Sequence, residues 1–171
     1  ELQAEFVPEA LEAFTYTDGN LYGIPYAIES VAFVRNTDLV PEQPATWEEV
    51  RAITEEIQSS EAAPYGFLSN DGDMYHNYGI MTAFGGYIFG QDDAGNFDPS
   101  DVGWNSEGNI AAAEFLAGMY NDGLMVTNIG DDELFQLFED GELAMFITGP
   151  WHANRVAESG VPHEVGPMPG S

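Results

Sequence analysis

The sequence predicts an α/β fold in which a mixed sheet is flanked by helices. Segments with the period of an amphipathic helix alternate along the chain with short runs of β-branched and aromatic residues, which are typical of strands. The 171 residues are 44% hydrophobic and 13% aromatic, which is the composition of a folded domain rather than of a disordered acidic tail.

The first 36 residues predict a short helix followed by extended chain. Residues 6–14 have helical spacing, and the turn TDGN follows at 17–20. The segment 21–36, LYGIPYAIESVAFVRN, is rich in β-branched and aromatic residues. It predicts one or two strands, with Pro25 at an edge or a bend.

A capping box begins the next helix. In Thr46-Trp-Glu-Glu49 the threonine hydroxyl covers an early backbone N–H group, and Glu49 reaches back to the cap. Behind the box, Val50, Ile53 and Ile57 recur at helical spacing. The helix therefore has one apolar face, and the glutamates between these positions form a solvated one.

The rest of the chain continues the alternation of strands and helices. Between residues 65 and 120 the predicted elements are a strand over 65–69, a helix over 74–84 ended by Gly85-Gly86, a hairpin over 87–97 around Ala94-Gly95-Asn96, and a helix from Ser106 to Tyr120. This last helix is expected to have Ile110, Ala113, Leu116 and Tyr120 on one face. The remaining predicted elements are a helix over 131–141, a strand over 143–147, a helix from Pro150 to Glu158, and a strand over 163–168. Gly141 is expected to end its helix in a left-handed conformation, and Pro150 suits a first helical position.

The charge of the chain is strongly one-sided. Thirty Asp and Glu residues stand against three Arg, at positions 35, 51 and 155, and the formal net charge is -27. Such a surface repels nucleic acid and anionic lipid, since both are bound by clustered Lys and Arg. Adaptation of the whole surface to high salt explains the charge most simply. Whatever the cause of the charge, the ligand is expected to be neutral or cationic, because the chain has few cationic side chains to hold an anion.

Several kinds of chemical site find no support. The chain has no Cys, so disulfides and Cys-based metal sites cannot form. There is no Gly-x-Ser-x-Gly motif, and His76, His152 and His163 have neither a triad spacing nor the i, i+4 spacing of a metal pair. The acidic turns at 70–73 and 92–98 lack the glycine and the final glutamate of an EF-hand loop. No catalytic residue, metal or cofactor is predicted.

Two aromatic residues and an acid suggest a binding surface. Tyr75 and Trp151 are expected at the beginnings of helices, and Glu29 is a lone acid within the apolar stretch YAIESVAF. Core packing explains either aromatic residue taken alone. A hydrogen bond to the backbone explains Glu29 equally well, since an unpaired buried acid is costly. Taken together, the three residues suggest a pocket floor of rings and acids.

Three stretches resemble, in order, segments of the maltose-binding type of extracellular solute-binding protein. They are LYGIPYAIESVAFVRNTDLVPEQPATWEEV (21–50), GFLSNDGDMYHNYGIMTAFGGYIF (66–89) and FEDGELAMFITGPWHANRVAESGV (138–161). The similarity extends over nearly the whole chain, including the spacer from Asp98 to Asp132. The ordered set is specific to the family, whereas the Gly-Pro-Trp motif alone is not.

The resemblance implies a piece of a two-lobed α/β receptor that feeds an ABC importer. In this family the ligand lies between the lobes, and hinge closure traps it. Residues 1–27 would be the tail end of the first lobe, 28–31 a hinge crossover, and 32–171 the second lobe without its C-terminal helices. Both ends of the chain look cut from a longer protein, so half of the cleft would be missing.

The resemblance also implies which residues bind the ligand. By position, Tyr75 and Trp151 fall on the side where the sugar stacks, and Glu29 falls at a cleft acid near the crossover. Asp73 stands where maltodextrin receptors have a Glu, and His76 replaces an aromatic neighbour of the tyrosine. The predicted ligand-binding residues are Glu29, Asp73, Tyr75, His76 and Trp151.

Sugar chemistry explains why these residue types would be used. A rigid aromatic face covers the apolar C–H face of a pyranose at low entropic cost, and carboxylates accept hydrogen bonds from its hydroxyls. Trp151 follows a strand whose end would face the cleft of an open α/β sheet. Gly149-Pro150 would fix the direction of the ring. A further sugar-contacting tyrosine of maltodextrin receptors is replaced near Asp131.

The function implied is that of a non-enzymatic, monomeric sugar receptor outside the cytoplasmic membrane. It would be extracellular or periplasmic and membrane-anchored in the full-length protein. Its ligand would be a malto-oligosaccharide or a related glycan, its partner the membrane permease of an ABC transporter, and it would bind no nucleic acid. Two alternatives stay open: a receptor for another solute, such as another oligosaccharide or a glycerol-phosphate compound, and an acidic glycoside hydrolase domain. Against the hydrolase, the thirty acids offer no distinguishable catalytic pair.

The charge leads to a prediction about salt. If the acidity is an adaptation to high salt, the melting temperature of the chain should rise steeply between low and molar salt, as the self-repulsion is screened. Thermal unfolding across a salt series measures this. A melting temperature that stays flat over the range would contradict the adaptation.

Overall fold

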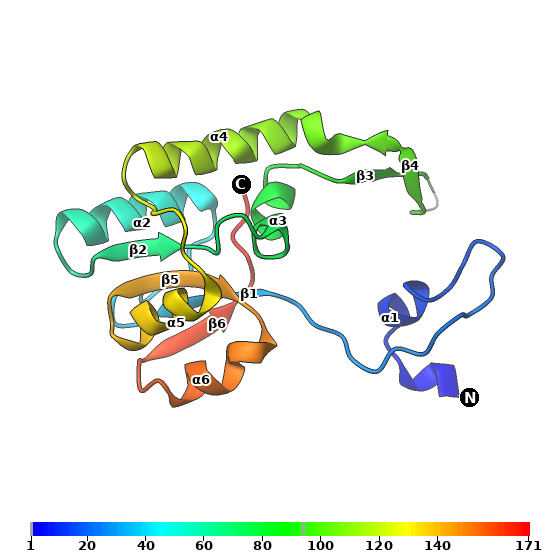
Figure 1. Cartoon of the computed structure of the whole chain (residues 1–171), viewed down its shortest axis with the longest axis horizontal. Coiled ribbons are helices and arrows are strands. Elements are labelled where there is room, and N and C mark those ends of the chain that lie inside the picture. The colour runs from blue at the N-terminus through cyan, green and yellow to red at the C-terminus, as the bar shows by residue number, and fades with distance from the viewer. Residues whose placement is uncertain (1, 94) are drawn as a thin grey trace. The chain divides into compact units, whose positions relative to one another are not determined.

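The computed structural model describes residues 2–93 and 95–171, and the chain divides into two compact units, Glu1–Ser30 and Val31–Ser171. The first unit contains a 3-10 turn, η1 (Leu2–Glu5), and the short helix α1 (Pro8–Glu12). Extended chain follows, with one isolated antiparallel bridge between Thr15 and Leu21. The four-stranded sheet described next lies in the second unit (Figure 1).

The second unit is organised by a mixed four-stranded sheet in the order β2-β5-β1-β6. Its strands are β1 (Ala32–Asn36), β2 (Tyr65–Leu68), β5 (Leu143–Thr148) and β6 (His163–Gly166). β2 pairs with β5 in parallel, and β1 pairs antiparallel with both β5 and β6. In this register Leu68 and Val34 both lie opposite Phe146 of the central strand β5.

Helices cover both faces of the sheet, which confirms the predicted α/β class (Figure 1). One face carries α2 (Trp47–Ser59), α3 (Met74–Ala83) and α4 (Glu107–Asn121). The other carries α5 (Asp131–Glu139) and α6 (Ala153–Glu158), which follows the 3-10 turn η3 (Pro150–His152). A short hairpin of β3 (Phe89–Gln91) and β4 (Phe97–Val102) and the 3-10 turn η2 (Gly103–Asn105) connect α3 to α4.

Aromatic side chains fill the core on the α2 face of the sheet. Phe33 of β1 and Phe67 of β2 stack with their ring centroids 6.0 Å apart, and the Trp47 ring of α2 lies 5.9 Å and 5.4 Å from them. All three residues are fully buried. Phe115 of α4 packs 6.2 Å from Trp47 and so joins the second helix to the same core.

The α5 face has a core of its own around Phe146. The Phe138 ring lies 5.0 Å from the Phe146 ring, and the Phe135 ring lies 6.4 Å from it. Arg155 of α6 places its guanidinium 3.9 Å from the centroid of Phe135, which ties α6 to α5. The helix predicted over 131–141 forms as α5. It ends just before Gly141, which takes a φ of 75° as predicted.

The predicted caps form, with one difference in detail. The Thr46 hydroxyl accepts a hydrogen bond from the Glu49 backbone N–H at 3.2 Å. Glu49, however, accepts from the N–H of Ala45 at 2.7 Å, one residue before the cap. Ser106 caps α4 as expected and accepts from the N–H of Asn109 at 3.3 Å.

The strand prediction over 21–36 is wrong for most of its length. Only Ala32–Asn36 forms a strand, and before it the structure shows an isolated bridge of Leu21 to Thr15 in place of the predicted strand. Tyr26 and Ile28 are exposed. A strand requires a partner in register, and the boundary between the two units falls within this segment, at Ser30 and Val31.

The face predicted for α4 is only partly correct, because Leu116 and Tyr120 pack against the core and the other two residues do not. Ile110 and Ala113 point to solvent, whereas Asn109, Ala112 and Met119 are buried. The Asn109 amide donates hydrogen bonds of 2.8 Å and 2.7 Å to two backbone carbonyls of the preceding connection, and this fixes the helix with a polar residue inward. The hairpin forms near its predicted place, although Ala94 at its expected turn lies outside the described residues.

Among the residues that the structure describes, no helix has the combined length and apolarity that a membrane span requires.

The packing of α2 on β2 leads to a prediction about Gly66. A Cβ atom at Gly66 would lie 2.4 Å from the Cα of Thr54 in α2, so Gly66→Ala should push the helix off the strand. Overpacking of this kind costs about 1–3 kcal/mol of stability. The matched control is Gly130→Ala, because nothing lies within 4 Å of its Cβ and its φ is -101°. Equal melting temperatures for the two variants would contradict the close packing.

Candidate functional site

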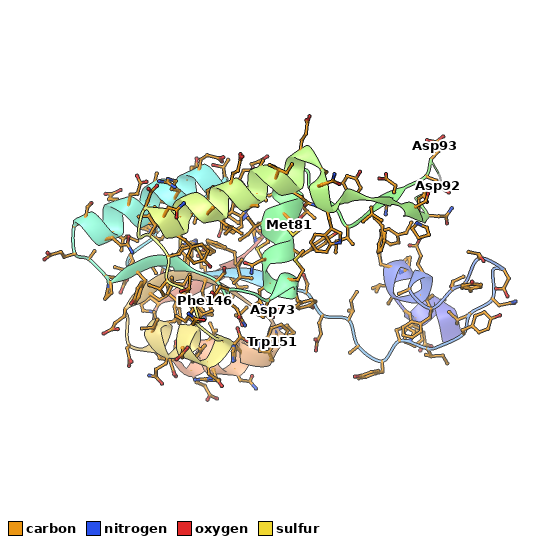
Figure 2. The ribbon with its side chains drawn as sticks, turned by 45° about the horizontal axis from the view of Figure 1, so that its top comes forward. Asp73, Met81, Asp92, Asp93, Phe146 and Trp151 are labelled. Carbon is orange, nitrogen blue, oxygen red and sulfur yellow. The ribbon has the colours of Figure 1, made fainter. Side chains whose placement is uncertain are left out.

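The site lies where two parallel strands end. Because β2 and β5 run in parallel, both have their carboxyl ends at the same edge of the sheet. The chain leaving β2 leads to Asp73, the N-cap of α3, and the chain leaving β5 leads through Gly149-Pro150 to Trp151. Figure 2 shows Asp73 and Trp151 close to each other. Ligands of open α/β sheets bind at this edge.

Asp73 holds the beginning of α3 together. One carboxylate oxygen accepts a hydrogen bond from the backbone N–H of Tyr75 at 2.8 Å, and the other lies 2.7 Å from Nδ1 of His76. The hydrogen bond from the Tyr75 N–H holds the pKa of Asp73 below its ordinary value, and His76 adds to this lowering, against the opposing effect of burial.

Asp131, the first residue of α5, joins three elements at this place. Its Oδ2 accepts a hydrogen bond of 2.8 Å from the indole N–H of Trp151. Its Oδ1 lies 3.3 Å from Nε2 of His76, and Oδ2 lies 3.7 Å from Nδ1 of His152. The side chain of Asp131 thus lies between α3 and the turn after β5.

His76 is buried between two carboxylates. It is 4% exposed, with Asp73 at one ring nitrogen and Asp131 at the other. The Nε2 atom of His76 and Oδ1 of Asp131 are both buried, and neither makes a hydrogen bond, although they face each other at 3.3 Å. An imidazole can donate through both nitrogens only when it is protonated, so the bridge between the two acids is complete in that form.

The two aromatic rings lie side by side with exposed faces. The centroids of Tyr75 and Trp151 are 6.1 Å apart at an angle of 41°, and His76 supports the indole from its edge at 5.6 Å. Tyr75 is 50% exposed and Trp151 is 42% exposed. Core packing therefore does not account for either residue, since the core aromatics of this chain are fully buried.

The turn before Trp151 requires a glycine for steric reasons. A Cβ atom at Gly149 would lie 2.2 Å from the Trp151 ring, so the indole can lie over this position only because no side chain is present. With Pro150 next to it and the hydrogen bond to Asp131, the glycine fixes the direction in which the ring projects.

The structure brings together four of the five predicted residues. Asp73, Tyr75, His76 and Trp151 are linked by the contacts described above. Glu29 is exposed and belongs to the first unit, so its part in this site stays a prediction.

The role of Asp131 was missed by sequence reasoning, which placed this residue only as the replacement of a sugar-contacting tyrosine. The sequence does show an acid in the first turn of a predicted helix, a position that the helix dipole favours. Its bond to an indole twenty residues away is visible only in three dimensions.

The site offers no cation to an anionic ligand. Each of the three arginines is engaged with carboxylates: Arg35 with Glu164, Arg51 with Glu55 and Asp122, and Arg155 with Asp132 and Glu139. Within residues 2–93 and 95–171, no group of three or more His, Asp or Glu side chains is arranged to hold a metal ion.

The lowered pKa of Asp73 predicts how stability depends on pH. Because the folded-state pKa lies below the unfolded value of about 3.9, the contribution of Asp73 is fully present above that value and is lost as the pH falls through the folded one. Asn remains a good N-cap, so Asp73→Asn removes the charge and keeps the cap. The stability difference between the two proteins should shrink below about pH 4. Parallel curves in acid denaturation would contradict this assignment.

Comparison of the sequence with known proteins points to a single protein family. The model of the bacterial extracellular solute-binding protein family matches residues 2–171. A galactooligosaccharide-binding protein of Bacillus subtilis (strain 168) is 33% identical over 158 residues, which cover 89% of this chain and 37% of that protein.

Two further relatives are named for maltodextrin and for maltooligosaccharide. A maltodextrin-binding protein of Bacillus subtilis (strain 168) is 30% identical over 89% of this chain and 38% of its own length. A maltooligosaccharide ABC transporter solute-binding lipoprotein of Streptococcus pneumoniae (strain ATCC BAA-255 / R6) is 28% identical over 91% of this chain and 38% of its own length. The chain thus spans less than two-fifths of the length of these relatives. On the match over residues 2–171, the chain belongs to the bacterial extracellular solute-binding protein family.

Proposed function

We propose that this chain forms most of the second lobe of a receptor that binds a malto-oligosaccharide or a related oligosaccharide for an ABC importer. Residues 1–27 belong to the first lobe, 28–31 to the hinge, and 32–171 to the second lobe. The observation that carries the proposal is the pair of half-exposed rings, Tyr75 and Trp151, fixed by a partly buried polar network around His76 at the carboxyl edge of the sheet.

The ring pair suits the apolar face of a sugar. Adjacent aromatic faces that are already held in place cover C–H groups without the cost of ordering flexible side chains. Trp151 is fixed by its hydrogen bond to Asp131, and Tyr75 sits in the first turn of α3, where Asp73 caps the helix. This wall is thus ordered before any ligand arrives.

The acids near the rings suit the hydroxyl rim. The side chain of Asp73 is 39% exposed, so lone pairs of its carboxylate remain available to a sugar hydroxyl. Glu29, in the proposed hinge segment, is the second acid that we propose for the ligand. His76 is buried, and it serves the ligand by holding Asp73, Asp131 and the indole in place.

The charges favour a neutral oligosaccharide over a phosphorylated solute. All three arginines are paired with acids, and a glycerol-phosphate compound would meet a surface with a net charge of -27. The printed names of the relatives, which refer to galactooligosaccharide, maltodextrin and maltooligosaccharide, support the same ligand class. In the proposed receptor the partner is the importer permease, and the protein acts outside the cytoplasmic membrane.

An acidic glycoside hydrolase is the alternative from another class. The two acids at this site are both used to hold structure, Asp73 as the cap of α3 and Asp131 as the partner of Trp151. Neither acid is therefore available as the general acid of a catalytic pair, opposite a second carboxylate that acts as the nucleophile. Recovery of maltotriose intact after incubation with the protein supports the receptor, whereas its cleavage would favour the hydrolase.

The proposal predicts a loss of sugar affinity for Trp151→Ala. In the complete receptor that contains this chain, the variant should lose about 1–3 kcal/mol of binding free energy, as for a central aromatic anchor. Its melting temperature without sugar should change little, because the ring is partly exposed. Calorimetric titration with a panel of oligosaccharides, together with thermal unfolding, measures both quantities.

The matched control is Trp47→Ala, since Trp47 is fully buried between Phe33 and Phe67. This variant should lose about 3–5 kcal/mol of stability. Unchanged sugar affinity with a collapsed melting temperature in Trp151→Ala would assign Trp151 to the core and overturn the stacking argument.

A further inference from the structure

A second aromatic surface lies beside the site, between α3 and the β3–β4 hairpin. It is a groove with a volume of about 470 Å³. Its side chains come from both walls: Tyr78 and Thr82 from α3, and Tyr87, Phe89, Gln91 and Phe97 from the hairpin and the segment before it. Phe97 is 70% exposed, and Tyr78 and Phe89 are also exposed. None of these residues belongs to the site described above.

One face of α3 runs from the first site to this groove. Tyr75, Tyr78 and Thr82 follow at intervals of three and four residues, so they lie on one side of the helix, and all three are exposed. The residues that α3 buries, His76, Ile80 and Met81, lie on its other sides. Tyr78 therefore belongs to the groove and also stands three residues along α3 from Tyr75, which is about 4.5 Å of axial rise.

The hairpin wall is fixed by close packing at its base. The backbone carbonyl of Tyr87 accepts a hydrogen bond of 2.8 Å from the buried Asn109, and its hydroxyl donates to Asp101 at 3.0 Å. Cβ atoms at Gly90 and Gly103 would collide with Asp101 and with the Tyr87 ring, at 2.0 Å and 2.4 Å. Close packing at Gly90 and Gly103 thus fixes Tyr87 and Asp101 at the base of the hairpin.

The chemistry of the groove repeats that of the first site. Exposed rings alternate with neutral groups that form hydrogen bonds, namely the Thr82 hydroxyl, the Gln91 amide and the Tyr78 phenol. The Asp101 carboxylate accepts the hydrogen bond of the Tyr87 hydroxyl, and no arginine is among the lining residues. Such a surface favours an uncharged ligand that has both apolar faces and hydroxyls.

We infer that the groove between α3 and the hairpin is an extension of the sugar site, which takes further sugar units of the same oligosaccharide. The inference rests on the proposed function, since the first units occupy Tyr75 and Trp151. Tyr78 is the link, and Phe89 and Phe97 cover the sugar units beyond it. A short oligosaccharide fills only the first site, whereas a longer one fills both, so the groove makes the receptor selective for chain length.

The test compares short and long sugars on the complete receptor that contains this chain. Maltotriose and maltoheptaose are titrated calorimetrically, in parallel with a short and a long galacto-oligosaccharide. Tyr78→Ala and Phe89→Ala should each weaken the long sugar about tenfold and leave the short one unchanged, because each removes one stacking face from the extension only. The two variants change opposite walls, so the result does not depend on the folding of one of them.

Two control variants separate this inference from the proposed function. Trp151→Ala should weaken short and long sugars alike, whereas Ile110→Ala, on the exposed outer face of α4, should weaken neither. If neither sugar series binds the receptor, or if Trp151→Ala has no effect, the proposed function fails and the extension fails with it.

If Trp151→Ala behaves as expected and the groove variants do not discriminate, only the extension is overturned. This holds when Tyr78→Ala and Phe89→Ala weaken both lengths equally, which assigns them to the first site. The extension is also overturned when the two groove variants weaken the binding of neither sugar but reduce transport, because the groove would then be a contact surface for the permease.

Discussion

The parallel pairing of β2 with β5 is the constraint on which the candidate site depends. Leu68 and Phe146 lie opposite each other in this pair, so the chain leaves both strands at one edge of the sheet. Asp73 follows the first strand and Trp151 follows the second, and an antiparallel pair would have sent them to opposite edges. The pairing is held from both faces, by Phe67 packed under Trp47 and by Phe146 packed on Phe138.

At that edge of the sheet, acidic side chains hold neighbouring residues in place. Asp73 caps α3, Asp131 holds the indole of Trp151, and His76 fills the space between the two carboxylates. In a chain with thirty acids, an acid at a helix beginning is easily taken for part of a solvated surface. Here the position is favourable for a second reason, because the first turn of a helix stabilises a negative charge. The same two carboxylates therefore stabilise helix ends and fix the rings that they touch.

The sequence predicted what depends on local pattern and failed where a distant partner decides. The capping box at Thr46, the stop at Gly141 and the turn before Trp151 formed as expected because each is specified within a few residues. The strand over 21–36 was predicted too long, since β-propensity does not reveal whether a partner strand exists. The first half of the α4 face, at Ile110 and Ala113, was misplaced because hydrophobic spacing ignores an amide such as Asn109 that is held inward by hydrogen bonds. Likewise, the resemblance supplied Tyr75 and Trp151, whereas the tie through Asp131 required coordinates.

The location of the contacts that fix Tyr75 and Trp151 bears on how the proposed receptor closes. The contacts described above that fix the two rings come from residues 73–152, within one unit. In the proposed receptor the aromatic wall is thus already formed within one lobe, and closure would add contacts to the ligand without having to order this wall. Binding free energy that would otherwise order flexible rings is then available to shift the equilibrium toward the closed state. A wall of this kind favours a sugar that first docks on one lobe and is then enclosed by the other.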